Sequence, residues 1–381
     1  MFRPSTKSGA GRRNQRLGSQ LRPRLVPSTC ASSSKAGPAR LARALLLPFG
    51  AAALGTVMLA TPTTTFAQDD PLNVVATVGM VADIAAEIGG ECVTVVALMG
   101  PGVDPHLYQA TSGDVRDLGR AELILYVGLS LEGQLGEVLD RFGRRTPTVA
   151  VGEDAIPPAE LIRTSDAYGV DPHVWMDVSL WARIVPGIRE AMLDALRGAR
   201  DDAANLAACQ EGMHLRAERL AHQLEALHDW VASATSTIPE HQRILVTAHD
   251  AFTYYGRAYG LDVIGIQGVS TESEAGVADI RSTAATIRNA GVPAVFIETT
   301  INPRTIQAVL DAAADLGHEA RLGGSLYSDA MGQPGTPDGT YLGMLRANTV
   351  AIVEALGGQP PELPEALSDW ANRHGLGGRQ P

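Results

Sequence analysis

The stretch CVTVVALMGPGVDPHLYQAT, residues 92–111, joins a strand, a loop and the start of a helix in one short run. Residues 92–99 are rich in β-branched and apolar side chains, which predicts a buried strand. Gly, Pro and Asp follow and predict a loop. Thr111 then stands at a suitable helix N-cap position, with Asp114 three residues later. A strand, a loop and a helix in this order are the repeating unit of an α/β fold.

The same alternation continues on both sides of this stretch. In the first part of the chain, strands are predicted at residues 72–78, 122–128 and 147–152, and a helix at residues 81–90. In the second part, strands are predicted at residues 243–249, 261–268 and 293–300, and helices at residues 277–291, 303–317 and 341–356. Strands separated by helices pair mostly in parallel, so the pattern predicts two α/β halves.

The middle of the chain differs, because residues 177–233 contain helical stretches with no strand between them. The second stretch begins near residue 203 and contains no Pro and no Gly except Gly212. We therefore expect an α/β fold of two lobes with mostly parallel sheets, joined by a single long rigid linker helix. The expected order is an N-terminal lobe at 71–202, the linker helix at 203–233, a C-terminal lobe at 234–358 and a loosely held Pro-rich tail at 359–381.

The first 67 residues have the pattern of an export signal. Residues 1–67 contain ten Lys or Arg, no acidic residue and the apolar run LARALLLPFGAAALGTVMLA. Thr65 and Ala67 supply the small residues that signal peptidase needs, so we expect cleavage near Ala67 and a periplasmic or extracytoplasmic protein. The alternative is an uncleaved membrane anchor, which the Pro and Gly inside the run disfavour. The long basic segment indicates a misassigned start codon or, through Arg12 and Arg13, a twin-arginine signal.

The charge that remains after residue 67 excludes one class of partner. The whole chain has a formal charge of −11, and residues beyond 67 keep 21 basic against 42 acidic residues, a formal −21. Nucleic acid is then an unsuitable partner, because binding phosphate needs the opposite charge.

Two cysteines lie beyond residue 67, Cys92 and Cys209. An exported protein with two cysteines often forms one disulfide. Two buried free thiols are the alternative, and the local sequence does not decide between them.

One five-residue motif occurs twice. Gly-Val-Asp-Pro-His stands at residues 102–106 and again at residues 169–173. Proline fixes its own φ and restricts the residue before it, so the histidine that follows is aimed by a stiff backbone. Ligands of open α/β folds bind at the carboxyl ends of strands. The repeat therefore predicts that His106 and His173 point into one crevice.

The second half contributes two more candidates. His249 ends a predicted apolar strand, and Asp329 follows a short strand-like run in a Gly-rich loop. Each has an ordinary structural alternative, a helix cap for the histidine and a turn for the aspartate. With His106 and His173 they make three imidazoles and one carboxylate, two from each half.

Five separate motifs resemble one known family. They are GPGVDPHLYQAT, DPHVWMD, HDAFTYYGRAYGL, QGVSTESEAGVADI and LYSDAMGQPGTPDGTYLGMLRANT. In this order they are similar to the TroA-like family, the extracytoplasmic solute-binding receptors of ABC importers for manganese and zinc. The first motif departs at Gly100, where the family usually has Pro. The resemblance covers residues 72–356.

The resemblance implies a metal site and a transport function. The family's metal ligands match His106, His173, His249 and Asp329. The family fold has two α/β lobes with the metal between them, joined by a rigid helix that matches residues 203–230. Glu298 resembles a position near the site that we do not expect to be a ligand. The implied protein is a monomer that carries Mn²⁺ or Zn²⁺ to a membrane permease and is not an enzyme.

The choice of metal and two other functions stay open at this point. Zinc outcompetes manganese at most nitrogen and oxygen sites. Zinc-specific relatives often carry a His-rich loop, whereas residues 141–169 contain no histidine, so we favour manganese, then zinc, then iron. A zinc-dependent hydrolase using the same cluster and a surface adhesin are the alternatives. The remaining histidines beyond residue 67 are interpreted as surface residues: His214, His222, His228, His241, His318 and His374.

Overall fold

The computed structural model describes residues 70–165, 169–200 and 202–377, which belong to one compact unit. The predicted export signal and its cleavage near Ala67 lie outside the described residues. We call residues 70–200 the N-terminal half and residues 237–377 the C-terminal half, and the long helix α7 (Ala203–Ser236) lies between them in the sequence.

The N-terminal half is built on one parallel sheet. Its strands are β1 (Leu72–Ala76), β2 (Val93–Ala97), β3 (Leu123–Tyr126) and β4 (Thr148–Ala150). They lie in the order β2-β1-β3-β4, all parallel, with Val74 of β1 opposite Val95 of β2 and Leu123 of β3. The helices are α1 (Gly79–Gly89), α2 (Ser112–Leu118), α3 (Gly136–Gly143), α4 (Val151–Ala155), α5 (Val178–Trp181) and α6 (Ile184–Ala199).

The helix predicted after the first Asp-Pro-His motif begins as expected. Thr111 accepts hydrogen bonds from the backbone N–H groups of Gly113 and Asp114, and the Asp114 carboxylate accepts one from Thr111 N. This reciprocal capping box satisfies donors at the start of α2. It confirms the N-cap prediction and fixes where the loop that carries His106 ends.

The C-terminal half repeats the parallel arrangement. Its strands are β5 (Ile244–His249), β6 (Asp262–Gln267), β7 (Ala294–Glu298) and β8 (Arg321–Leu326). β5 pairs with β6 and β7 pairs with β8, both in parallel, and β5 lies beside β7. The helices are α8 (Thr253–Tyr259), α9 (Val277–Ala290), α10 (Arg304–Asp315), α11 (Tyr341–Ala355) and α12 (Ser368–Arg373). The prediction of an α/β fold with parallel sheets is therefore confirmed.

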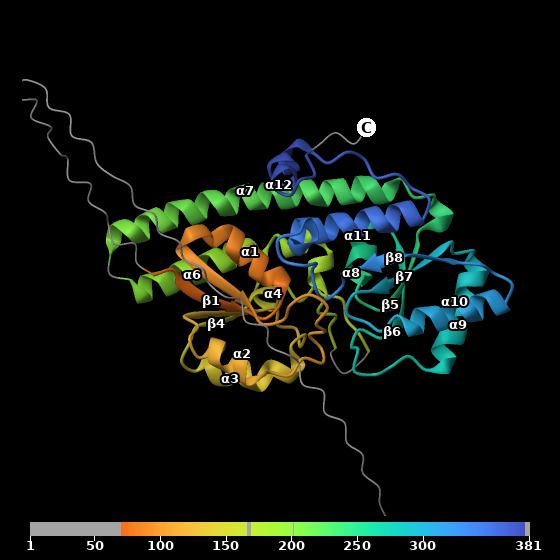
Figure 1. Ribbon diagram of the computed structural model, residues 1–381, viewed down its shortest axis with the longest axis horizontal. Coiled ribbons are helices and arrows are strands. Elements are labelled where there is room, and N and C mark those ends of the chain that lie inside the picture. Colours follow the sequence, from red (N-terminus) through yellow and green to blue (C-terminus); the bar gives the residue numbers. More distant parts are fainter. Residues whose placement is uncertain (1–69, 166–168, 201, 378–381) are drawn as a thin grey trace, which may run out of the picture. The chain divides into compact units, whose positions relative to one another are not determined.

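Helix α7 packs against both halves. Along one face it contacts α1, α5 and α6 of the N-terminal half, and further along it contacts α8 and α11 of the C-terminal half. Figure 1 shows it running over both halves as a single green helix. Leu220, Leu224, Leu227 and Val231 are buried at the 3- and 4-residue spacing that places them on one face. The helix is continuous over Ala203–Ser236, whereas the expected bounds of the linker helix are residues 203–233.

The expectation of a loosely held tail is wrong for the described part of residues 359–377. Trp370 of α12 is buried and its indole N–H donates to Thr340 Oγ1 at 3.1 Å. Trp230 of α7 donates to the Pro361 carbonyl at 3.0 Å. The proline content indicates poor order, but two buried indole groups that need acceptors hold the segment against α7 and against the start of α11.

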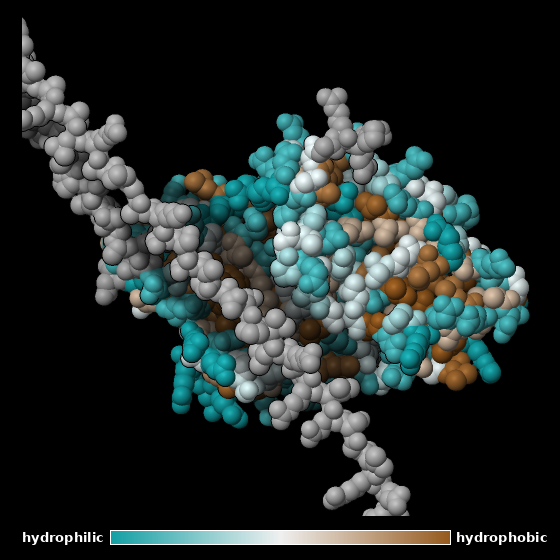
Figure 2. Space-filling model, viewed as in Figure 1, coloured by the Kyte–Doolittle hydropathy of each residue, from teal (hydrophilic) through white to brown (hydrophobic). Residues whose placement is uncertain are grey.

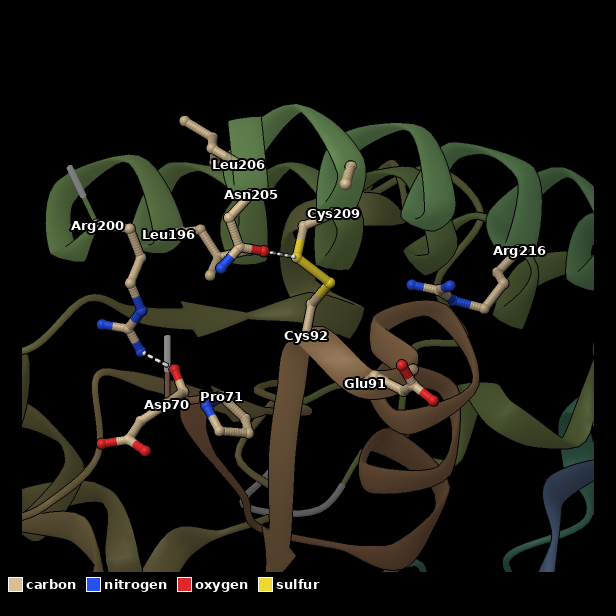
Figure 3. Close-up of a pocket in the computed structure, with 12 residues that line it drawn as sticks. Asp70, Pro71, Glu91, Cys92, Leu196, Arg200, Asn205, Leu206, Cys209 and Arg216 are labelled. Carbon is tan, nitrogen blue, oxygen red and sulfur yellow. Dashed lines mark hydrogen bonds between the residues drawn. A yellow bond between two sulfur atoms is a disulfide. The ribbon is translucent and has the colours of Figure 1, made fainter. Parts of the chain in front are cut away.

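The two cysteines form a disulfide. Cys92, which precedes β2, is bonded to Cys209 of α7, 117 residues later (Figure 3). On the same stretch of α7, Arg216 donates to the carbonyls of Ile88 and Gly89 at 2.7 Å, where α1 ends. The first part of α7 is therefore fastened to the N-terminal half by a covalent bond and by a guanidinium group.

The surface of the described residues is mixed in polarity. Figure 2 shows hydrophilic residues over much of the visible face, with apolar patches mainly over the C-terminal half. Among the described helices, none is both long and apolar enough to cross a bilayer.

Candidate metal centre

The structure brings together the four side chains that the sequence singled out. His106, His173, His249 and Asp329 each offer one ligand atom, and these atoms all lie within 4.8 Å of one another. The three histidines are 0% exposed and Asp329 is 2% exposed, so the cluster is closed to solvent. Two of the four residues come from each half, as predicted.

The spacing of the donor atoms matches a small coordination sphere. Nε2 of His173 lies 3.3 Å from Nε2 of His106 and 3.4 Å from Nε2 of His249. Asp329 Oδ1 lies 3.3 Å from His173 Nε2, and its Oδ2 lies 3.2 Å from His249 Nε2 and 3.9 Å from His106 Nε2. Two atoms that bind one metal ion through bonds of about 2.0–2.2 Å lie at most about 4.4 Å apart, and all five of these distances are shorter. The cluster therefore suits a single divalent ion.

The two copies of the repeated motif share one backbone device. Gly102 and Gly169 both have positive φ, 73° and 68°, a conformation that glycine adopts without strain. Two residues further on, Asp104 Oδ1 accepts from His106 N and Asp171 Oδ1 accepts from His173 N, each at 2.9 Å. An aspartate that bonds the backbone two residues later closes a tight local turn. The repeated sequence is thus a turn that presents a histidine.

The second copy has an additional bond. Asp171 Oδ1 also lies 2.8 Å from His173 Nδ1, so the carboxylate holds the far side of the imidazole and leaves Nε2 toward the cluster. The backbone before it is fixed by a bridge between Arg163 and Val170 and by the bond from Asp171 N to Ile162 O. A carboxylate behind a ligand histidine sets its tautomer and raises its basicity.

His249 has an equivalent support from the neighbouring strand. It is the last residue of β5, and Glu298 is the last residue of β7 beside it. Glu298 Oε1 accepts from His249 N at 2.8 Å, and Oε2 lies 2.5 Å from His249 Nδ1. The expectation that Glu298 is near the site but is not one of the four clustered residues agrees with this geometry.

Asp329 is presented by a loop that the N-terminal half helps to fix. The Trp175 indole N–H donates to the carbonyl of Ser328, the residue before Asp329, at 2.9 Å. The Trp175 ring also packs edge-on against the His173 ring, 5.2 Å between centroids. Both carboxylate oxygens of Asp329 are buried, and no backbone or hydroxyl group among the described residues donates a hydrogen bond to them. A buried carboxylate without donors needs a cation to compensate its charge.

The buried histidines and carboxylates of the cluster shift the pKa values of one another. Burial would lower the pKa of His173, but Asp171 and Asp329 outweigh it and raise this pKa to about 9. Burial likewise opposes charge on His249, yet Glu298 and Asp329 raise its pKa well above the usual value. Burial would raise the pKa of Asp329, but His249 and His173 lower it well below the usual range. Each shift has one cause, because a buried imidazole and a buried carboxylate side by side favour the charged form of each other.

The other histidines stay outside the cluster. His214, His222 and His241 are exposed, in agreement with the surface interpretation. The other three, His228, His318 and His374, are half-buried. His228 Nδ1 lies 3.1 Å from the Tyr259 hydroxyl, and His318 Nε2 lies 2.8 Å from the Val292 carbonyl. These contacts are structural.

Sequence reasoning missed the residues behind the ligands. The roles of Asp104 and Asp171 are not predicted by the sequence analysis above, although an aspartate at the same position in both copies of the repeat is a signal for them. Trp175 and Thr271 lie in the motifs DPHVWMD and QGVSTESEAGVADI and attracted no separate prediction. Their partners, the Ser328 carbonyl and the Asp104 carboxylate, are more than 150 residues away, and such pairings depend on the tertiary fold.

The chain matches known metal-binding proteins over most of its length. The family model described as "ZnuA: Zinc-uptake complex component A periplasmic" matches residues 74–355. The manganese-binding lipoprotein MntA of Bacillus subtilis (strain 168) is 42% identical over 288 residues, which is 76% of this chain and 90% of that protein. The zinc-binding protein TroA of Treponema pallidum (strain Nichols) is 43% identical over 290 residues, again 76% and 90%.

A solved structure agrees with these relatives. The periplasmic zinc-binding protein TroA from Treponema pallidum superimposes with a TM-score of 0.70, covering 75% of this chain and 99% of that one. The relatives are metal-binding proteins and not enzymes, which confirms the prediction that this chain is a binding protein. The chain therefore belongs to the ZnuA family of periplasmic metal-uptake components, the TroA-like metal-binding receptors of ABC importers.

Proposed function

We propose that this protein captures one divalent transition-metal ion with His106, His173, His249 and Asp329 and delivers it to the permease of an ABC importer. One observation carries the proposal. Among the described residues, the buried Asp329 carboxylate receives no hydrogen bond from a backbone or hydroxyl group and faces the three imidazole nitrogens at 3.2–3.9 Å. Neutral imidazoles and a carboxylate are the ligands of ions from manganese to zinc.

We favour manganese as the physiological ion, with zinc next and iron third. Oδ1 and Oδ2 of Asp329 each face a different histidine, at 3.3 and 3.2 Å, so the carboxylate is placed to bind through both oxygens. That would give five donors, whereas a closed zinc site normally has four. Oxygen donors suit manganese. Zinc nevertheless binds most nitrogen and oxygen sites with higher intrinsic affinity than manganese, so a higher affinity for zinc in vitro would not identify the physiological ion. Relatives of nearly equal identity are named for manganese and for zinc, 42% and 43%.

The division of ligands between the halves gives a delivery mechanism. An ion held by two residues from each half is itself a bond between them. Its loss removes that bond, and the continuous helix α7 limits how far the halves separate, so we expect a small opening. A permease that prefers the closed, loaded form would distinguish it from the empty form by differential affinity. We expect the receptor to act as a monomer.

Native mass spectrometry of the exported protein, purified without chelator, tests the capture step. We expect one divalent ion per chain, and an empty chain even after soaking in Mn²⁺ and Zn²⁺ would contradict the proposal. Asp329→Ala should fold and yet lose affinity. Unchanged affinity in that variant would remove Asp329 from the site. His249→Ala gives a second, independent check of the ligand set.

Identity and delivery need separate experiments. Elemental analysis of protein taken from its own cell envelope should find manganese in excess of zinc. Uptake of labelled Mn²⁺ should fall in a strain that lacks the gene and return with the wild-type gene but not with Asp329→Ala. Uptake of labelled Zn²⁺ falling instead would reverse our order of metals.

A further inference from the structure

The metal centre is closed, so an ion leaves only if something moves. All four clustered side chains are at most 2% exposed. The contacts that cross between the two halves beside the cluster therefore decide which ligand separates first. The two copies of the repeated motif differ in these contacts, although their local turns are alike.

The second copy is bonded into the C-terminal half through buried groups on several sides. The Tyr254 hydroxyl donates to the Asp171 carbonyl at 2.9 Å. The Trp175 indole donates to the Ser328 carbonyl at 2.9 Å, and the Tyr341 hydroxyl donates to the Trp175 carbonyl at 2.7 Å. Tyr254, Trp175 and Tyr341 are all fully buried. Moving His173 away from His249 and Asp329 would break these bonds together.

The first copy crosses to the C-terminal half through its aspartate side chain. Asp104 Oδ2 accepts from the Thr271 hydroxyl at 2.6 Å, while Oδ1 of the same carboxylate accepts from His106 N. Thr271 lies in the loop after β6 and is buried, whereas Asp104 is only partly buried. One carboxylate thus joins the backbone that presents His106 to a loop of the opposite half.

We propose that Asp104 and Thr271 form a latch, and that release of the ion begins when this hydrogen bond breaks and His106 moves away. His173, His249 and Asp329 remain together on the other side. The inference rests on the proposed function and adds an order of events to it. The latch needs no change in the ligands themselves, because Asp104 holds the histidine through its backbone.

Release kinetics of the loaded protein test the latch. Thr271→Val removes the hydroxyl, keeps the side-chain shape and leaves the bond from Asp104 to His106 N intact. Loaded with Zn²⁺ or with Mn²⁺ and mixed with excess colorimetric chelator, this variant should release its ion at least about tenfold faster than wild type, because a hydrogen bond to a charged group is lost. Thr271→Ser keeps the hydroxyl and should restore the slow rate.

A matched control separates the latch from general loosening. Thr349 is also buried and its hydroxyl lies 3.0 Å from the Tyr255 hydroxyl, a contact that stays inside the C-terminal half. Thr349→Val should lower the melting temperature and leave release at the wild-type rate. Equal release rates for wild type and Thr271→Val, or equal acceleration by Thr349→Val, would overturn the latch.

A double-mutant cycle between Asp104 and Thr271 tests the latch a second way, in case one of the single variants folds poorly. Asp104→Ala should accelerate release, and adding Thr271→Val to it should have no further effect, since their shared bond is already gone. Independent, multiplying effects would overturn the latch. Failure of the proposed function would look different, because wild-type protein would then bind no ion at all.

Discussion

The two copies of Gly-Val-Asp-Pro-His have one backbone design and two uses of the aspartate. In both copies a positive-φ glycine precedes a turn in which the aspartate bonds the histidine N–H. Asp171 then adds a bond to the ring of its own histidine, whereas Asp104 reaches across to Thr271. Identical sequence therefore specifies how a histidine is presented, while the surroundings decide whether the aspartate bonds the ring of that histidine or joins the two halves.

Replacing each of the two histidines by alanine should give the largest difference between the two copies of the motif. His106→Ala and His173→Ala should each weaken metal binding by more than about 100-fold, since even loss of a supporting group costs 10–100-fold. In the metal-free state, the two variants should differ in their folding free energy. His173→Ala strands the buried Asp171 carboxylate and should cost about 3–5 kcal/mol of folding free energy. His106→Ala should cost about 1–2 kcal/mol, as for an ordinary buried truncation.

Isothermal titration with Zn²⁺ and chemical denaturation of the metal-free variants measure both quantities. Equal destabilisation by the two substitutions would contradict the different roles of the two aspartates.

Neutralising the aspartates is the next largest test. Asp171→Asn should weaken metal binding by about 10–100-fold, because the amide no longer raises the basicity of His173. Asp104→Asn keeps an oxygen for His106 N and a donor for Thr271, so we expect less than about a tenfold change. Competition with a chelator of known affinity measures the pair. If Asp104→Asn lost more metal affinity than Asp171→Asn, then Asp104, and not Asp171, would be the aspartate that tunes its histidine.

Proton release offers a finer comparison. The pKa of His173 is raised to about 9 and that of His249 well above the usual value, so both imidazoles should hold a proton more firmly in the metal-free protein than a free imidazole does. Metal needs neutral imidazoles, so about two protons should leave per ion, and affinity should increase with pH from about 6.5 to about 9. Asp171→Asn should release about one proton fewer, and Asp104→Asn the same number as wild type.

Metal affinity should increase with pH, whereas the stability of the metal-free fold should decrease with pH. A raised pKa stabilises the metal-free fold fully below the unfolded value of about 6.5, and this contribution is lost as the pH rises through about 9. Metal should therefore raise the melting temperature more at pH 8.5 than at pH 6.5. Calorimetry in buffers of different ionisation enthalpy counts the protons, and a count of zero would contradict the coupling.

The smallest effects should come from the shared part of the two copies. Gly102→Ala and Gly169→Ala each place a Cβ at positive φ, which costs about 1–2 kcal/mol. Among the described residues, neither added Cβ would meet an atom closer than the Thr299 carbonyl, at 3.6 Å from Gly102, so we expect strain to dominate. Thermal melting should find similar losses in the two variants and metal affinity within about tenfold of wild type. A clear difference between them would show that the two turns are not equivalent.

Much of this architecture could be predicted from local patterns. The strand-loop-helix run at residues 92–111, the cap at Thr111 and the uninterrupted helix from residue 203 depend on neighbours in sequence, and the structure confirms them. The four clustered side chains were found because two lay in a repeat and all lay in motifs of one family. His106, His249 and Asp329 follow or end the strands β2, β5 and β8, whereas His173 is presented by the turn of the repeated motif.

The features that the sequence did not predict depend on pairs of residues that are far apart in the chain. The pairing of Cys92 with Cys209 stayed open because nothing local brings residues 117 positions apart together. Trp370 made the tail a packed segment, although its proline content predicted loose chain. Asp104 and Thr271 are 167 residues apart, and neither sequence context indicates the other.

The disulfide has a mechanical consequence for helix α7. Near its start the helix is bonded to the N-terminal half through Cys209 and Arg216, and near its end Trp230 is bonded to the segment beyond α11. At 1.5 Å per residue, the helix between these attachments acts as a lever roughly 20–30 Å long. Because both ends of this segment are attached, we expect a separation of the two halves to bend α7 rather than to slide it along either half.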